Sequence, residues 1–521
     1  MSAKKKTATK GKKANQEDIL IDMMKGYPLL RTDTDIFAKI TRNGKTCNVS
    51  LNSAEFIFYV KSEFKELTGS FPISTTMRDC IDYIKNLAYN KEITEARYRI
   101  SPYADNSIIY DLSNGKCVKI DKDGWKIEEN NYPMFIQSKD QLPQVTPIRS
   151  ERGWERLYKY LNVSAEEKLL LTVYIATCFN PSIVYPSISV NGTNGSGKST
   201  LSRIVKKIID PSISDLESFP DSLNNLRVRL NACYYTAFDN ISKLTDKQSD
   251  FLCQVVTGTS STERQYYTNK DIDCTHLKSS MCLNGISNFI FRTDFAERVL
   301  FFSTKLIRDR NRLEESKIWD SFNEDLPYIL GGIFDLLSSA LKIAPNIKIE
   351  NPIRLADFHR FGYAVAEAMG NRGKEFDEVL KSNKDRQMEI TCENAMLIRL
   401  LIDFLKENDG EWCSTMTFLY KALRDFMNEN DSDVYPREAY PKASNHFSSE
   451  LKKYESALSS KGVTIFIKKN SDGNSEISIT TDWVIRKSIK IGREPIVFDV
   501  DEKRKILAQL IDESTADDVD N

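Results

Sequence analysis

The chain has 521 residues, 40% of them hydrophobic, which is enough for roughly three to four domains with ordinary cores. Its 73 basic and 74 acidic residues balance, so bulk charge gives no reason to expect a polyanion-binding protein, and any nucleic-acid contact must be local. No apolar run reaches membrane-spanning length, and the lysines at the start precede no apolar core, so we expect a cytoplasmic protein with no membrane partner. The ten cysteines include no C-x-x-C pair, which favours reduced core cysteines over a zinc site.

The first 150 residues show three successive patterns. Residues 1–16 are typical of a disordered Lys-rich tail. Residues 17–96 predict a helical region, because apolar residues recur at helical spacing in AEFIFYVKSEFKEL. Residues 97–150 predict a small antiparallel β subdomain and a linker. Apolar and polar residues alternate from Arg97 onward, and the turn sequences SNGK and KDGW interrupt this alternation as hairpin turns would.

After two predicted helices that begin near Gly153, strands and helices alternate from about Pro186 to Thr304, which indicates an α/β core at residues 151–310. Ser164 and Glu167 have the spacing of a capping box at the start of a helix in this core. Helical patterns continue through residues 311–388. Residues 389–490 predict three helices followed by a two-stranded hairpin, the pattern of a winged helix, and residues 491–521 end in an acidic tail.

The strongest motif is NGTNGSGKST, which follows a short apolar strand at residues 187–190 and opens a helix. This is the complete G-x-x-x-x-G-K-S pattern, in which glycines let backbone amides approach phosphates, Lys198 reaches the β and γ phosphates, and Ser199 ligates Mg²⁺. We therefore expect ATP and Mg²⁺ as cofactors. The predicted nucleotide-binding residues are Gly192, Thr193, Asn194, Gly195, Ser196, Gly197, Lys198, Ser199 and Thr200.

A second apolar strand, ACYYTAFDN, ends in Asp239, which we expect to join Ser199 in the Mg²⁺ shell. An ATPase normally carries Glu at the next position, where it polarises the attacking water, and this chain carries Asn240. An amide hydrogen-bonds water without taking its proton. Two readings follow: water held by Asn240 and Asn284, which lies on the next predicted strand (280–287), or a base from elsewhere, such as Asp246 or Asp250.

Two further segments flank that third strand. Before it, RQYYT-NKD-IDCTHLK predicts two strands around a polar tip at residues 269–271. After it, Arg292 and Arg298 flank a short acidic turn, and transition-state charge in phosphoryl transfer is commonly neutralised by an arginine from a neighbouring subunit.

In this order the motifs GTNGSGKST, AFDNIS, TGTSSTERQYYTN, LNGIS, DFAERVL, LPYILGGIFDLL and RLADFHRFG resemble the AAA+ ATPases of helicase superfamily III and related replication helicases of phages, plasmids and genomic islands. The resemblance runs from about Tyr103 to Thr481. It implies an AAA+ core at 151–310, a helical lid region at 311–388, and a homo-hexameric ring that translocates on single-stranded or forked DNA.

The resemblance also implies residue roles. Arg298 would be the arginine finger, with Arg292 a weaker candidate, and Asn284 the sensor. The hairpin would point into the ring channel, with Lys270 at its tip contacting the DNA backbone and Arg264 and Lys278 nearer its base.

The terminal region predicts its own DNA contacts. A helix from near Ser444 would place Phe447, Leu451, Tyr454 and Leu458 on one apolar stripe, with Lys452 on the opposite, recognition face. Lys468 and Lys469 approach the turn NSDGN and would lie on the wing.

Two functions remain open from the sequence. The first is an ATP-driven helicase that replicates a phage or mobile element. The alternative is a nucleotide-gated initiator or regulator that assembles on origin DNA without unwinding it, which Asn240 and the predicted winged helix both favour.

Overall fold

The computed structural model describes residues 15–33, 35–42, 45–132, 134–136, 138–264, 272–285, 289–290, 292–308, 312–394, 396–430, 435, 440–469, 475–482 and 484. These divide into two compact units. The first takes the described residues of Met1–Asn240, Gln254–Asn284 and Phe302–Val379, and the second those of Ile241–Cys253, Gly285–Phe301 and Leu380–Asn521.

The N-terminal part of the first unit combines helices with a sheet. Its elements are α1 (Gln16–Lys25), β1 (Leu29–Arg31), β2 (Ile36–Arg42), β3 (Lys45–Ser50), α2 (Ala54–Thr68) and α3 (Ser74–Ala88). The antiparallel sheet β1-β2-β3 was not expected from the sequence, which predicted helices throughout residues 17–96. In β2, Ala38 and Ile40 point to the core at a spacing of two, and an Asn-Gly pair in the sequence at 43–44 is a typical hairpin signal.

The predicted small β subdomain is a four-stranded antiparallel meander in chain order. Its strands are β4 (Ile100–Pro102), β5 (Ile108–Asp111), β6 (Lys116–Asp121) and β7 (Gly124–Glu129), with a short 3₁₀ helix η1 (Ala104–Asn106) after β4. Neighbouring strands pair in the register Ile109↔Lys119 and Ile120↔Trp125. The alternation of apolar residues in this part of the sequence therefore correctly predicted an antiparallel sheet.

A five-stranded sheet lies at the centre of the α/β region, in the order β14-β8-β13-β10-β9. Its strands are β8 (Ser187–Asn191), β9 (Glu217–Ser218), β10 (Tyr235–Asp239), β13 (Ser280–Gly285) and β14 (Val299–Ser303). β10 pairs with both β13 and β9 in parallel, and the first four residues of β8, β10 and β14 are buried, as expected for a sheet covered on both faces. The predicted α/β class is confirmed, and the structure adds that β10 pairs with both neighbours in parallel.

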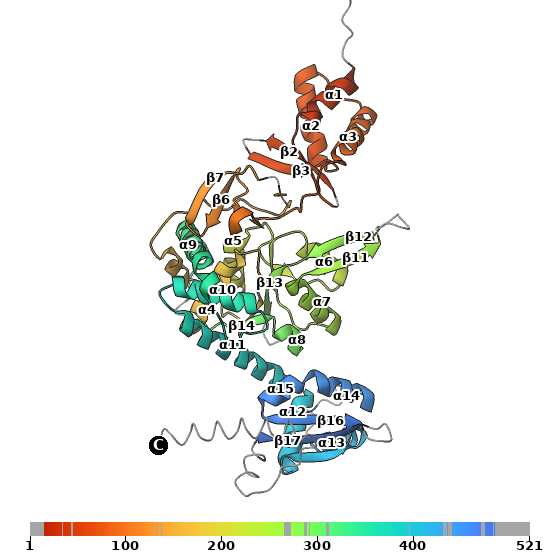
Figure 1. Ribbon diagram of the computed structural model, residues 1–521, viewed down its shortest axis with the longest axis vertical. Coiled ribbons are helices and arrows are strands. Elements are labelled where there is room, and N and C mark those ends of the chain that lie inside the picture. Colours follow the sequence, from red (N-terminus) through yellow and green to blue (C-terminus); the bar gives the residue numbers. More distant parts are fainter. Residues whose placement is uncertain are drawn as a thin grey trace, which may run out of the picture. The chain divides into compact units, whose positions relative to one another are not determined.

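Helices α4 (Ala165–Cys178), α9 (Glu315–Ile343) and α10 (Ala356–Ala368) pack on one another (Figure 1), and α9 also packs on the 3₁₀ helix η2 (Gly153–Lys159). A short 3₁₀ helix, η4 (Ala344–Asn346), follows α9. Helix α9 packs closely against the backbone near Ile148. A Cβ on Gly331 of α9 would lie 2.0 Å from the carbonyl oxygen of Ile148, so only glycine fits there. By length and composition Glu315–Asn346 is apolar enough to span a membrane, yet 61% of its most apolar window is buried inside the protein, as in a core helix.

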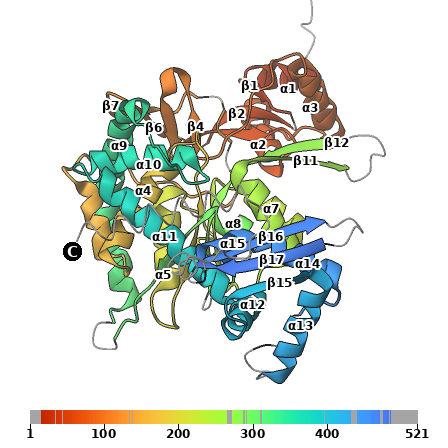
Figure 2. The same ribbon diagram turned by 60° about the horizontal axis from the view of Figure 1, so that its bottom comes forward.

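The other helices and strands between residues 193 and 300 are α5 (Lys198–Ile209), α6 (Leu223–Leu230), α7 (Asp246–Thr257), α8 (Thr293–Ala296), β11 (Thr259–Arg264) and β12 (Ile272–Leu277). β11 and β12 form a separate antiparallel ribbon (Figure 2) whose register runs from Thr259↔Leu277 to Arg264↔Ile272. The predicted second arm is present as β12. Of the predicted first arm, RQYYT, only Arg264 lies within the described residues, and it is the last residue of β11. The predicted tip, with Lys270, lies outside the described residues.

Helix α11 (Gly373–Asn394) begins in the first unit and ends in the second. The C-terminal part of the second unit then contains α12 (Met396–Glu407), β15 (Glu411–Thr415), α13 (Met416–Glu429), α14 (Ser444–Lys453), α15 (Glu455–Ser460), β16 (Val463–Lys469) and β17 (Ser475–Thr481). The strands form an antiparallel sheet in the order β15-β17-β16. β15 was not predicted, and the single helix expected from Ser444 is divided at Tyr454. The expected apolar stripe is otherwise present, since Phe447, Leu451 and Leu458 are buried in one core cluster.

Candidate nucleotide-binding site

The glycine-rich loop connects the end of β8 to the start of α5, the context that the sequence predicted. Gly195 (φ +73°) and Gly197 (φ +86°) have left-handed backbones, which glycine adopts without steric cost. Ser196 is fully buried, and its hydroxyl donates to the carbonyl oxygen of Thr193 (2.7 Å), which ties the loop to itself. The loop is therefore held in shape by its own backbone conformation and by a buried hydroxyl.

Lys198 is the first residue of α5 and is 8% exposed. Its Nζ donates to the carbonyl oxygens of Gly192 (2.7 Å) and Thr193 (3.0 Å), so the ammonium group lies across the loop. Burial lowers the pKa of Lys198, and the charge of Asp239 acts in the opposite direction. The contacts keep a cation beside the loop, where bound phosphates would meet it.

Ser199 and Asp239 come from different elements and meet at the carboxyl edge of the sheet. The Ser199 hydroxyl lies 3.2 Å from Oδ2 and 3.4 Å from Oδ1 of Asp239. A hydroxyl and a carboxylate side by side are hard oxygen donors of the kind that Mg²⁺ uses together with phosphates and water. The residues fit Mg²⁺, and Ser199 and Asp239 would hold it.

Asn240 follows Asp239 with φ +55°, a left-handed conformation in which Asn is enriched and most other residues are strained. Its backbone N–H donates to Oδ1 of Asp239 (2.9 Å) and to Oδ1 of Asn284 (3.1 Å). Asn284 is fully buried and also donates from Nδ2 to the hydroxyl of Ser202 on α5 (3.3 Å). The backbone gives a conformational reason for Asn rather than Glu at position 240, and Asn284 joins the strand ends to α5.

The two candidate arginines are both engaged. Arg298 is 8% exposed, and its Nη1 donates to the carbonyl oxygen (2.6 Å) and Oδ1 (2.7 Å) of Asp294 in α8. The guanidinium of Arg298 is therefore bound to Asp294 within its own chain. Arg292 forms ion pairs with Asp250 (2.8 Å) and Asp246 (3.9 Å), the two carboxylates that the sequence offered as alternative bases.

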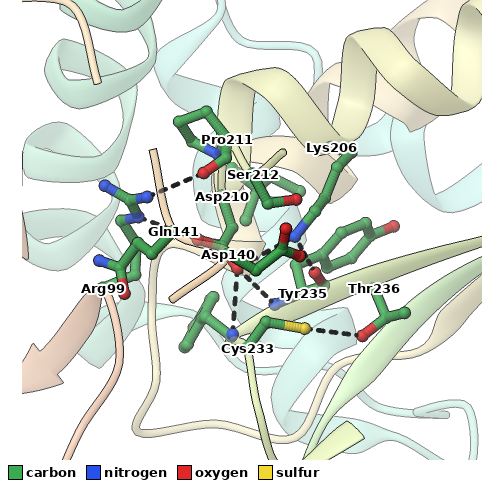
Figure 3. A network of polar contacts seen from close by, with 12 residues as sticks. Arg99, Asp140, Gln141, Lys206, Asp210, Pro211, Ser212, Cys233, Tyr235 and Thr236 are labelled. Carbon is green, nitrogen blue, oxygen red and sulfur yellow. Dashed lines mark hydrogen bonds and ion pairs between the residues drawn. The ribbon is translucent and has the colours of Figure 1, made fainter. Parts of the chain in front are cut away.

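A buried network that the sequence did not reveal joins the far end of α5 to β10 and to the β subdomain (Figure 3). Asp210, 2% exposed, accepts hydrogen bonds from Nε of Arg99 (2.9 Å), Nζ of Lys206 (3.2 Å) and the backbone N–H groups of Tyr234 (3.1 Å) and Tyr235 (3.2 Å). Burial by itself would raise the pKa of Asp210, but the charges of Lys206 and Arg99 hold it below its ordinary value.

This network fixes α5 relative to β10, because Lys206 also donates to the carbonyl oxygen of Tyr235. The positions of the loop at the start of α5 and of Asp239 at the end of β10 are thereby fixed relative to each other. The only sequence signal was the spacing of Lys206 and Asp210, four residues apart on a helix; Arg99 is more than a hundred positions away.

The predicted DNA-contacting lysines have different surroundings. Lys278 donates from Nζ to the carbonyl oxygen of Pro181 (3.2 Å), and burial together with the charge of Arg97 lowers its pKa. Arg264 ends β11 opposite Ile272. Lys452 on α14 and Lys468 and Lys469 on β16 are exposed.

Two family models match the chain in order. The model for the actinomycete integrative conjugative element replication protein matches residues 155–376, and the model for the AICE RepA C-terminal domain matches residues 395–490. The first match contains the loop, Asp239, Asn284 and both candidate arginines, and the second contains α12 to β17. A comparison with curated proteins gives no match.

Solved structures give distant similarities. An apo structure of the NrS-1 C terminal region has a TM-score of 0.39 and 12% identity, over 89% of this chain and 99% of that one. An apo structure of NrS-1 residues 305–718 has a TM-score of 0.37 and 10% identity, over 90% and 100% of the two chains. A JCV helicase bound to a small acetamide compound has a TM-score of 0.24 and 15% identity, over 44% of this chain and 60% of the helicase. By its two family matches, the chain is similar to replication proteins of actinomycete integrative conjugative elements.

Proposed function

We propose that the protein is an ATP-dependent DNA helicase that replicates a mobile genetic element. The observation that carries this proposal is the meeting of Ser199 and Asp239 at 3.2 Å beside a complete phosphate-binding loop, with Asn284 at the end of the neighbouring strand. Phosphoryl transfer depends mainly on positioning and charge stabilisation, and these groups supply both for ATP and Mg²⁺. Because both family matches are to replication proteins, we propose that ATP hydrolysis at this site drives work on DNA.

The working form in this proposal is a homo-hexameric AAA+ ring in the cytoplasm, with a helical lid formed from residues 311–388. Arg298 acts across the subunit interface after release from Asp294, and its burial in the single chain means that assembly must supply that rearrangement. The β11–β12 ribbon grips DNA in the ring channel, with Lys270 and Arg264 as phosphate contacts. Lys278 is the weaker contact, because its ammonium group already bonds Pro181.

The C-terminal elements act as a winged helix that binds DNA. The sheet β15-β17-β16, with α13 packed on it and α14 packed on α13, supports this assignment, as do the exposed Lys452, Lys468 and Lys469. Lys468 and Lys469 are adjacent at the end of β16, so one contact with the phosphate backbone can use both.

The test is strand displacement on forked DNA with 5′ and 3′ tails. Wild-type protein with ATP and Mg²⁺ should displace the strand, and Lys198→Ala should not, because the loop loses its cation. Lys122→Ala is the matched control: its side chain is 68% exposed and pairs only with the adjacent Asp123 among the partners described, so activity should be kept. ATP hydrolysis without displacement on either fork contradicts the helicase proposal.

A second function, the nucleotide-gated initiator, is favoured by one observation. Asn240 offers no carboxylate, and its left-handed backbone disfavours Glu there. In that case ATP drives assembly on duplex origin DNA with negligible turnover. Brisk DNA-stimulated hydrolysis excludes this alternative, and measuring hydrolysis and assembly in the same samples separates the two functions.

A further inference from the structure

The chain after β14 passes directly along the phosphate-binding loop. The backbone N–H of Thr304 donates to the carbonyl oxygen of Asn191 (2.9 Å), just before the loop, and the Thr304 hydroxyl lies 2.7 Å from the buried hydroxyl of Ser196 inside it. A Cβ on Gly192 would lie only 2.3 Å from that Thr304 hydroxyl. We call residues 304–308 and 312 the strap, and its first residue is bonded to the loop at two points.

Asn162 fastens the strap and the loop together. Its side-chain Nδ2 donates to the backbone carbonyl oxygens of Ser196 (2.9 Å) and Lys305 (2.5 Å). Its backbone carbonyl oxygen accepts from the backbone N–H of Lys305 (3.1 Å). One amide side chain therefore bonds both segments. The strap is held against the loop of its own chain by contacts that do not depend on a second subunit.

Farther along, strap side chains lie over the loop glycines. The Cδ1 atom of Ile307 is 3.5 Å from the position that a Cβ on Gly197 would take. At Gly195 the corresponding position is 2.9 Å from Nη2 and 3.6 Å from Cζ of Arg312. The Arg312 guanidinium thus lies against the backbone of the loop, although no arginine occurs in the loop motif itself.

The charged groups around the loop together form a site suited to an anion. Lys198 and Arg312 bring two cations to one six-residue loop whose backbone amides also favour negative charge. A planar guanidinium donates two parallel hydrogen bonds to phosphate oxygens, whereas an ammonium acts as a point charge. A nucleotide phosphate chain is the ligand that satisfies both.

We propose that Arg312 is a nucleotide-binding residue that contacts the phosphate chain in cis, on the same subunit whose loop binds it. This inference rests on the proposed function, and it names a phosphate contact outside the recognised motifs. It differs in kind from the role of Arg298, which would act on a neighbouring subunit's nucleotide. The strap bonds of Thr304 and Asn162 preorganise the approach of Arg312.

The experiment titrates fluorescent ATP and ADP analogues against full-length protein, at concentrations where light scattering shows single subunits. Arg312→Ala should raise Kd by about 10-fold or more, in line with the loss of a charged hydrogen bond, and Arg312→Lys should fall between it and wild type. Arg308→Ala is the matched control, an exposed arginine on the same strap, and its Kd should not change. Thermal unfolding of each variant checks that the fold is kept.

Each outcome has one meaning. Wild-type affinity in Arg312→Ala overturns the inference, as does an equal loss in Arg308→Ala, which would indicate a general charge effect. A loss that appears only after assembly also overturns it, because the contact would then act in trans. If wild type and Lys198→Ala bind nucleotide equally poorly, the proposed function itself fails; if only the Arg312 variants behave as wild type, it stands and this inference alone falls.

Discussion

Replacing Asp210 by Asn tests whether its buried network with Arg99 and Lys206 fixes the position of α5, which carries the nucleotide-binding loop, relative to β10. The substitution keeps the size of the side chain and removes its charge, which leaves Arg99 and Lys206 buried, with side chains 0% exposed, and without their common carboxylate. Breaking a buried ion pair in this way costs about 3–5 kcal/mol. With an m-value of about 2 kcal/mol per molar, the urea midpoint falls by about 1.5–2.5 M.

The assay combines urea unfolding with hydrogen exchange of the backbone amides of Tyr234 and Tyr235, both of which donate to Asp210. Faster exchange at these two amides ties the loss of stability to this place in the fold. Asp123→Asn is the control, because that carboxylate is 72% exposed and its pair with Lys122 is worth at most about 1 kcal/mol. Equal midpoints for the Asp210 and Asp123 variants would refute the reasoning.

The stability that Asp210 contributes to the fold should depend on pH in a predictable direction. The pKa of Asp210 is held below its ordinary value in the folded protein, so its ionised form stabilises the fold. That stabilisation is fully present above the unfolded pKa of about 3.9 and is lost as the pH falls through the lower folded pKa. The difference in stability between wild type and Asp210→Asn should therefore shrink in acid, below about pH 4.

Three further outcomes follow from single contacts. Asn240→Val should destabilise the fold by about 1–2 kcal/mol in chemical unfolding because of its left-handed backbone, while Asn240→Gly should not; equal effects would show that φ is not the constraint. Ser164→Ala should cost about 1 kcal/mol in the same assay, because Ser164 and Glu167 form a complete capping box at the start of α4, and no change would mean that the cap is dispensable. Lys468→Ala with Lys469→Ala should weaken DNA binding and reduce the slope of log affinity against log salt by about 0.9 per lost phosphate contact, and an unchanged slope would remove both from the interface.

Local patterns were sufficient for much of the fold. The three strands β8, β10 and β13, which carry the start of the loop, Asp239 and Asn284, were predicted with ends that differ by at most three residues, because buried parallel strands are short continuous apolar runs. The capping box at Ser164 was predicted because its two hydrogen bonds join residues three apart. The sheet β1-β2-β3 was missed because the helical spacing of the neighbouring segment was extended over it, although its Asn-Gly pair was a usable signal.

The sequence by itself determined the residue types of a nucleotide site and the elements that carry them, since these depend on neighbours within a few positions. The motif order also predicted that Asp239 would join Ser199, and the Ser199 hydroxyl lies 3.2 Å from the Asp239 carboxylate. Only the tertiary structure decided that Asp210 meets Arg99 and that the backbone N–H of Asn240 donates to Asn284. It also buried Arg298 against Asp294 and brought Arg312 to Gly195, more than a hundred positions away along the chain. Such contacts depend on strand order and on the path of the chain between strands, which no local pattern encodes.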